Sequence, residues 1–303
     1  MKKIILTVVI LISIASSVSA CDICGCGLGN YYIGMLPQFN RSFFGLRYQY
    51  RRFHTRLADD PTQFSNDIFQ SVELWGGFNI GKKWQVLAFL PFNINKQVSD
   101  EGTTKTHGLG DLALIANYKI FERESVNSHN HIVSQQFWLG GGLKLPTGKF
   151  EVDPSAADLI AIANSQMGSG STDFMLNTMY NIRINNVGIN STANYKLNTT
   201  NKSDYRFGNK FSANSFAYYS IKSKKVNFAP NIGLMYEHSE GNKLKNQKID
   251  QTGGYVASAA GGIEMNLRKV SIGVNAQLPF AQNFANGQTQ TKLRAMVHVT
   301  FEL

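Results

Sequence analysis

Hydrophobic and polar residues alternate along most of the chain after residue 41. In the segment 41–53, Phe44 and Leu46 fall on one face, while Arg47 and Gln49 fall on the other. A period of two over this length is typical of a β-strand whose two faces meet different surroundings. The alternation recurs at residues 66–80, 84–96, 108–120, 132–146, 172–184, 186–198, 208–222, 226–239, 252–267, 270–282 and 289–303. We therefore predict an all-β chain of about twelve antiparallel strands.

The connections between the predicted strands alternate in length. One set is tight, at residues 81–83, 185, 223–225 and 268–269, and the other is long, at residues 54–65, 97–107, 147–171, 199–207 and 240–251. Only the connection at 121–131 breaks this rule, because it is long where a tight turn is expected. A secreted β-sandwich also has alternating strands, but they average about five to six residues, whereas about nine to eleven residues cross a bilayer. The pattern thus favours a single transmembrane, up-and-down β-barrel of the outer membrane.

Composition agrees with a barrel and excludes two other classes. Charged residues make up 17% of the chain, which contains 27 Gly, 20 Phe and 12 Tyr. After the N-terminal segment, no apolar run reaches the roughly twenty residues of a transmembrane helix, so a helical membrane protein is excluded. The net charge of +10 comes from scattered Lys and Arg residues. Because these cations form no basic block interleaved with aromatic residues, we expect no binding of nucleic acid.

The N-terminus has the features of an export signal. Met1 is followed by two lysines, residues 4–14 are apolar, and small residues precede Cys21. Such a segment is removed on export. We therefore divide the chain into a signal peptide (1–20), a Cys-containing periplasmic segment (21–40) and an outer-membrane barrel (41–303). The even number of strands places both chain ends on the periplasmic side.

One short helix is predicted in the longest loop, on the extracellular side. Asp153 can cap its start, Pro154 suits the first turn, and apolar residues continue to Met167. Long loops of this kind are often functional. The helix either folds into the mouth of the barrel as a constriction or lies over the rim.

Three glycine-rich motifs carry a resemblance to a known family. They are His107-Gly-Leu-Gly-Asp111, Gly140-Gly-Gly-Leu-Lys-Leu-Pro-Thr-Gly-Lys149 and Gly168-Ser-Gly-Ser-Thr-Asp173. Together they resemble the outer-membrane barrels of the MetA-pathway of phenol degradation family. The resemblance implies a barrel that moves small, often hydrophobic compounds across the outer membrane, without catalytic residues. The Cys21-x-x-Cys24-x-Cys26 segment is an addition to that pattern.

Charged residues at alternating positions are predicted to line the lumen. Their side chains either pair with one another and fill the barrel or form a selective pore. The predicted lumen-lining residues are Arg47, Arg51, Glu73, Asp111, Lys144, Asp173, Arg183, Glu264, Arg294 and His298.

The cysteine cluster allows three interpretations. Cys21 could be lipidated, because the residues before it resemble a lipobox. A disulfide is the second, since the periplasm is oxidising, although three cysteines leave one unpaired. In the third, Cys21, Cys24 and Cys26 bind a soft metal such as Cu or Zn, together with His129 and His131, which lie in a connection on the same side of the membrane.

These observations lead to one principal function and two alternatives. The principal prediction is a transporter or channel for small molecules or ions, surrounded by outer-membrane lipid and without enzymatic activity. One alternative is a metal-linked protein that captures or delivers Cu, Zn or Fe with its cysteines. The other is a structural or assembly barrel with a packed lumen and a periplasmic protein partner.

Overall fold

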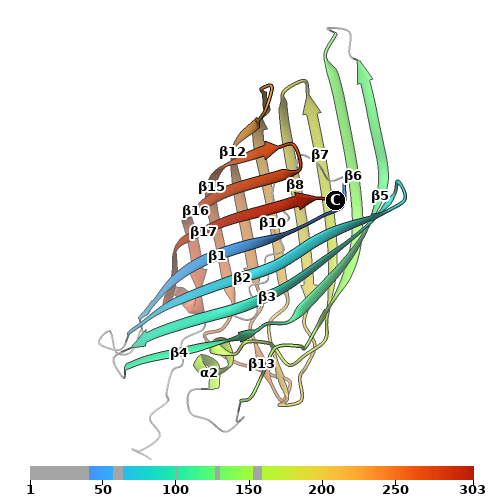
Figure 1. Cartoon of the computed structure of the whole chain (residues 1–303). Helices are drawn as coiled ribbons and strands as arrows, with labels where there is room; N and C mark the ends of the chain where they lie inside the picture. The colour runs from blue at the N-terminus through green and yellow to red at the C-terminus, as the bar shows by residue number, and fades with distance from the viewer. Residues whose placement is uncertain (1–40, 57–63, 100–101, 127–129, 153–158) are drawn as a thin grey trace, which may run out of the picture.

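The fold is a closed β-barrel of twelve antiparallel strands. The computed structural model describes residues 41–56, 64–99, 102–126, 130–152 and 159–303. The wall consists of β1 (Phe43–Arg56), β2 (Phe64–Ile80), β3 (Trp84–Ser99), β5 (Leu112–Val126), β6 (Ile132–Leu145), β7 (Asp173–Ile184), β8 (Val187–Leu197), β10 (Lys210–Tyr219), β12 (Asn227–Ser239), β15 (Gly254–Leu267), β16 (Val270–Phe284) and β17 (Thr289–Glu302). Each strand pairs with the next, and β1 pairs with β17 to close the wall (Figure 1). The predicted fold class is confirmed.

Smaller elements extend this wall. β4 (Gly102–Leu109) pairs with β3, and β11 (Ile221–Lys222) pairs with β12. The loops contribute α2 (Leu159–Ser165), η1 (Ala285–Gly287), and the small sheet of β9 (Tyr205–Arg206), β13 (Lys243–Leu244) and β14 (Gln247–Lys248). Among the described residues, no helix is long and apolar enough to cross a membrane.

The two ends of the barrel differ, as the connection lengths predicted. We call the end with the connections at 81–83, 185–186 and 268–269 the turn end, and the end that carries α2 and β13 the loop end (Figure 1). The two positions Asn185 and Arg268 adopt positive φ values of 51° and 50°, as the tight hairpins require.

Two connections predicted from the sequence are wrong. Residues 97–107 are not a loop, because β4 continues the hairpin that β3 begins and pairs with it from Phe92 to Ser99. The connection at 121–131 is shorter than expected, because β5 continues to Val126 and β6 begins at Ile132. Both hairpin extensions are rich in exposed polar residues, so they lack the alternation that marks the rest of the wall.

Of the predicted helix, residues 159–165 are helical, and residues 153–158 lie outside the described part of the chain.

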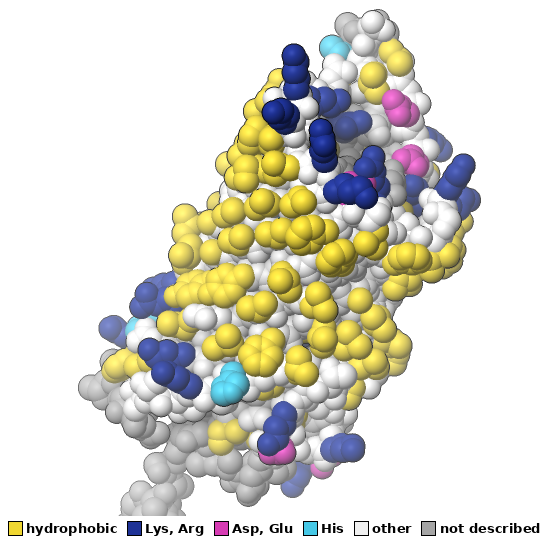
Figure 2. Space-filling model, in the orientation of Figure 1, with side chains coloured by type: hydrophobic (Ala, Val, Ile, Leu, Met, Phe, Trp, Pro, Cys, Tyr) yellow, Lys and Arg dark blue, Asp and Glu magenta, His cyan; other side chains and the backbone are white. Residues whose placement is uncertain are grey.

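The outer face of the barrel is an apolar belt. Figure 2 shows hydrophobic side chains around the middle of the wall, with Lys and Arg concentrated towards its two ends. Leu176 and Ile232 are 62% and 69% exposed, respectively. Large apolar side chains exposed in a continuous band are accounted for by contact with lipid. The alternation of side chains along each strand therefore places apolar residues on the membrane face.

A charge introduced into this belt should destabilise the barrel. We expect Leu176→Arg to lower the free energy of unfolding by about 2–4 kcal/mol, because the guanidinium would lie in hydrocarbon. Urea titration in lipid vesicles measures the change. Asn186→Arg, in an exposed turn, is the matched control and should leave stability within about 0.5 kcal/mol of wild type. Equal effects of the two substitutions would contradict a membrane position for Leu176.

Candidate functional site

A buried lysine between two carboxylates holds the loop end together. Lys144 is the penultimate residue of β6, Asp173 begins β7, and Asp111 lies at the junction of β4 and β5. The Lys144 Nζ atom is 2.6 Å from Asp111 Oδ2 and 2.8 Å from Asp173 Oδ2, and all three side chains are at most 5% exposed. Lys144 and Asp173 are direct partners across the β6–β7 pair, so strand register brings them together. We call these three residues the lysine clamp.

The lysine clamp fastens the long loop between β6 and β7 to the wall. Asp111 accepts hydrogen bonds from the backbone N–H groups of Gly148 (3.0 Å) and Ser169 (2.9 Å). Lys144 donates to the hydroxyl of Ser169 and to the carbonyl of Ser171. Both ends of the loop are thus bound to the same buried charges. A charged pair whose remaining hydrogen-bonding positions are satisfied is the arrangement that offsets the cost of burial.

The same loop lies against the inner wall. Asn93 on β3 donates to the carbonyl of Met167 (3.0 Å), and Asn95 donates to that of Ser165 (3.3 Å). Both asparagines alternate with outward-facing Phe92 and Ile94, so they belong to the luminal face of β3. The end of α2 therefore packs on the inside of the barrel near its mouth. Of the two positions considered for this helix, these contacts agree with the one inside the mouth.

Three loops then pack on one another at the loop end. An apolar cluster joins Val152 and Ala163, from the β6–β7 loop, to Tyr205 and Phe207, from the β8–β10 loop. Leu244, from the β12–β15 loop, packs against this cluster. These loops therefore pack as one unit with an apolar core of their own. The lysine clamp connects that unit to the barrel wall.

The three sequence motifs converge at this point. Asp111, Lys144 and Asp173 come one from each motif, and each was predicted from alternation to face the lumen. The structure buries all three and brings them into contact. The sequence did not indicate the loop partners Ser169 and Ser171, because only the folded loop places them near Lys144.

The remaining predicted lumen-lining residues form smaller groups. Arg47 bonds to Glu73, His298 Nε2 lies 3.0 Å from Glu264 Oε1, and Arg294 donates to Glu237 at 2.6 Å. Each of these six residues is buried, while Arg51 and Arg183 are partly exposed. Glu237 also faces inward, between outward-facing Tyr236 and His238, as its place in the alternation predicts.

A buried apolar cluster fills one side of the interior, which the sequence did not predict. It comprises buried side chains on the inner face of β1, β2, β3, β5, β6 and β7, namely Phe43, Trp75, Leu87, Phe89, Ala113, Ile115, Trp138, Met175 and Met179. We call this set the luminal apolar cluster. Arg47 covers its edge, with the guanidinium carbon 5.0 Å from the Trp75 ring centroid. The interior is thus divided between paired charges and a packed hydrophobic cluster.

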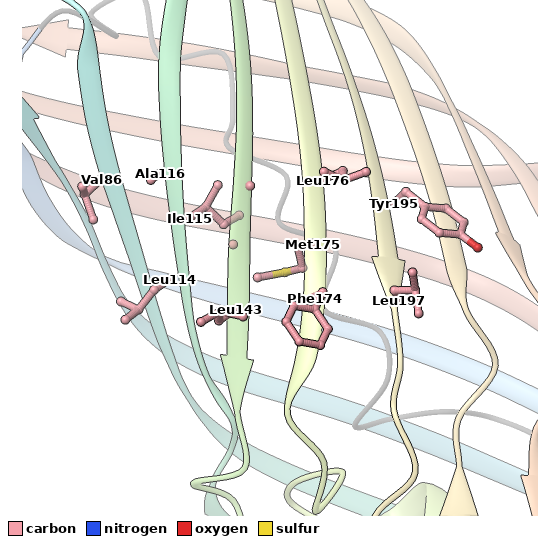
Figure 3. Close-up of a pocket in the computed structure, with 12 residues that line it drawn as sticks. Val86, Leu114, Ile115, Ala116, Leu143, Phe174, Met175, Leu176, Tyr195 and Leu197 are labelled. Carbon is pink, nitrogen blue, oxygen red and sulfur yellow. The ribbon is translucent and has the colours of Figure 1, made fainter.

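A groove of about 630 Å³ on the outer face is a separate feature. Figure 3 shows Leu114, Leu143, Phe174 and Leu176 around it, on β5, β6 and β7. These four side chains are 39–62% exposed, so the groove opens towards lipid. It exists because Gly141 places no side chain between them. Unbroken pairing of β5, β6 and β7 separates it from the lumen.

The predicted metal and lipid sites lie mostly outside the described residues. Cys21, Cys24, Cys26 and His129 are all in undescribed segments. His131 is exposed at the turn end, where its Nδ1 atom is 2.7 Å from the side-chain nitrogen of Asn185. Within the described residues, no group of three or more His, Cys, Asp or Glu side chains is arranged to hold a metal. Lipidation, disulfide formation and metal binding all remain predictions.

Comparisons with known proteins identify related barrels. The family model of the MetA-pathway of phenol degradation matches residues 54–293. An outer membrane channel from Pseudomonas putida F1 has 14% sequence identity and a TM-score of 0.60, over 87% of this chain and 96% of that one. The β domain of the Bordetella autotransporter BrkA has 9% identity and a TM-score of 0.50, over 87% of this chain and 100% of that one. None of the curated proteins compared with the chain matches its sequence.

Proposed function

The chain belongs to the MetA-pathway of phenol degradation family of outer-membrane barrels, and from this premise we propose that it is a gated transporter for small, predominantly apolar solutes. The luminal apolar cluster carries this proposal. The lumen of a water-filled barrel is normally polar. Here six neighbouring strands turn Trp75, Ile115, Met179 and related side chains inwards as a buried apolar cluster, along which an apolar solute would pass once the lumen opens.

The lysine clamp supplies the gate in this proposal. It fixes the β6–β7 loop at the loop end, which we place on the extracellular side, with both termini on the periplasmic side. Loops that open and close over a site are held by a few contacts and release on the microsecond-to-millisecond timescale. Passage would require the loop to move while the wall, held by the paired strands, stays in place.

Solute uptake tests the proposal directly. Vesicles with a lipopolysaccharide outer leaflet and the reconstituted barrel should take up benzyl alcohol faster than empty vesicles. A structural barrel, whose lumen is packed to support a partner rather than to conduct, gives the same rate as empty vesicles. The proposal assigns the barrel no catalytic chemistry.

A polar substitution within the luminal apolar cluster should discriminate between solutes. We expect Met179→Gln, which nearly conserves volume, to lower benzyl alcohol uptake several-fold, because the new amide must be desolvated by each apolar solute that passes. Uptake of glycerol through the same barrel should change little. A parallel loss for both solutes would indicate a general defect in folding or opening instead of a lost apolar path.

A further inference from the structure

Two arginines face each other on the inner wall of the barrel. Arg51 on β1 and Arg294 on β17 are direct partners in the antiparallel register, and both side chains lie on the luminal side. Directly opposed residues in such a pair have Cβ atoms about 4.5–5.5 Å apart, and like charges there destabilise the sheet. Glu237 offsets part of this repulsion, because it binds Arg294 and attracts Arg51, and an anion bound between the two guanidinium groups would offset more of it.

Arg294 has two donors available for such an anion. Its Nη1 atom donates to Glu237 Oε1 at 2.6 Å, which leaves Nε and Nη2 buried without a hydrogen-bond partner among the described residues. The residue is only 4% exposed. The Nε–H and Nη2–H bonds of a guanidinium point the same way, and this fork matches the two oxygens of a carboxylate. Buried donors of a charged group are costly to leave unpaired, so these atoms indicate a ligand position.

A small cavity adjoins these donors. It measures about 30 Å³ and is lined by Arg51 and Arg294 together with Gln49, Gln277, Met235 and Met296. That volume is about the share of one molecule in liquid water, so it accepts a single small head group rather than a whole solute.

The surroundings of the cavity are apolar on one side. Met235 and Met296 belong to a buried cluster that also contains Phe216. The Arg294 guanidinium carbon lies 5.8 Å from the ring centroid of Phe53. A ligand whose charged head sits at the two arginines would therefore direct its remaining atoms along methionine and phenylalanine side chains.

We propose that Arg294, with Arg51 beside it, binds the carboxylate of a small organic acid whose body is apolar, as such a solute passes through the lumen. The inference rests on the proposed transport function and narrows it to amphipathic monocarboxylates. Glu237 fixes the orientation of Arg294 through the Nη1 contact. The bond to the solute forms and breaks without covalent chemistry.

Benzoate and its neutral amide, benzamide, test this proposal. Binding of each to the detergent-solubilised barrel is measured by NMR titration, and uptake of each is measured in the lipopolysaccharide vesicles. We expect wild type to bind benzoate more tightly than benzamide. Arg294→Gln should weaken benzoate binding about tenfold or more, because charged hydrogen bonds are lost. Arg294→Lys keeps the charge but loses the fork. We expect its affinity for benzoate to lie between those of wild type and Arg294→Gln.

Controls separate this proposal from the transport function itself. Arg123→Gln removes an exposed cation on β5 near the turn end and should leave benzoate binding unchanged. Heat-modifiable mobility in gels reports whether each variant folds.

Equal benzoate binding by wild type and folded Arg294→Gln overturns the site, whether or not benzamide is transported. Chloride binding as tight as that of benzoate overturns the organic acid as the ligand. Benzoate binding that depends on Arg294, without uptake of any solute, supports the site and refutes the transport function on which the inference rests.

Discussion

Replacing Lys144 with methionine is expected to raise the mean conductance of the barrel in a planar bilayer several-fold. Methionine keeps much of the side-chain volume but leaves Asp111 and Asp173 buried, close together and without a cation. Removing one member of a buried charged group costs about 3–5 kcal/mol, because the remaining charges are uncompensated. The chain can relieve this cost by releasing the loop into water, which opens the mouth.

Lys119→Met is the matched control for this substitution. Lys119 is also a buried lysine on the inner wall, with an ion pair to Glu122 at 2.8 Å, but it lies towards the turn end of β5. Its ion pair with Glu122 lies within β5, and its contact with the Trp138 ring joins it to β6. Conductance should therefore stay near the wild-type value. A rise of the same size in both variants would show that any lost luminal lysine loosens the barrel, and the gate assigned to Lys144 would be wrong.

Gly168→Val is expected to open the mouth by a different route, without changing any charge. A Cβ atom at Gly168 would lie 2.4 Å from Asp111 Oδ1 and 2.6 Å from the carbonyl oxygen of Gly148. Contacts this short force the backbone of the loop away from the wall, because neither the neighbouring main chain nor the buried carboxylate can retreat. Conductance should rise as it does for Lys144→Met, and limited proteolysis should cut the β6–β7 loop faster than in wild type.

The control for steric displacement is Gly141→Val. The nearest atom to a Cβ at Gly141 is the carbonyl oxygen of Met175 at 3.6 Å, an ordinary contact, and the position faces the outer groove. This substitution should leave conductance and proteolysis unchanged. If Gly168→Val also leaves both unchanged, the close packing of the loop on the wall does not keep the mouth closed.

The alternation of side chains predicted the strands where they contact lipid, because outward-facing positions there are apolar. It predicted them less well where a hairpin extends beyond the membrane. The residues of β4, Gly102 to Leu109, are mostly polar and lack an apolar face, so the sequence pattern predicted a loop there. The end of β5 was misread for the same reason. A strand outside the bilayer has no hydrophobic face to reveal it.

The interior was harder to predict than the wall. The sequence placed Glu73 in the lumen correctly by position, but Trp75, two residues further along the same face, was not assigned there. When inner and outer positions are both hydrophobic, as at Leu74 and Trp75, alternation no longer distinguishes the faces. The luminal apolar cluster therefore became visible only in the fold. In the same way, the motif residues were identified singly, and their meeting in the lysine clamp depends on strand register and on the folding of the loop.

Uptake of benzyl alcohol into lipopolysaccharide vesicles, compared among four preparations, tests the central claim most directly. The preparations are empty vesicles, wild type, Lys144→Met, and Lys144→Met combined with Met179→Gln. A lumen that guides apolar solutes behind a gate predicts the slowest uptake for empty vesicles, an intermediate rate for wild type and the fastest for Lys144→Met. Adding Met179→Gln should then reduce the rate of the open variant. Four equal rates, with every barrel folded, would contradict both the apolar path and the gate.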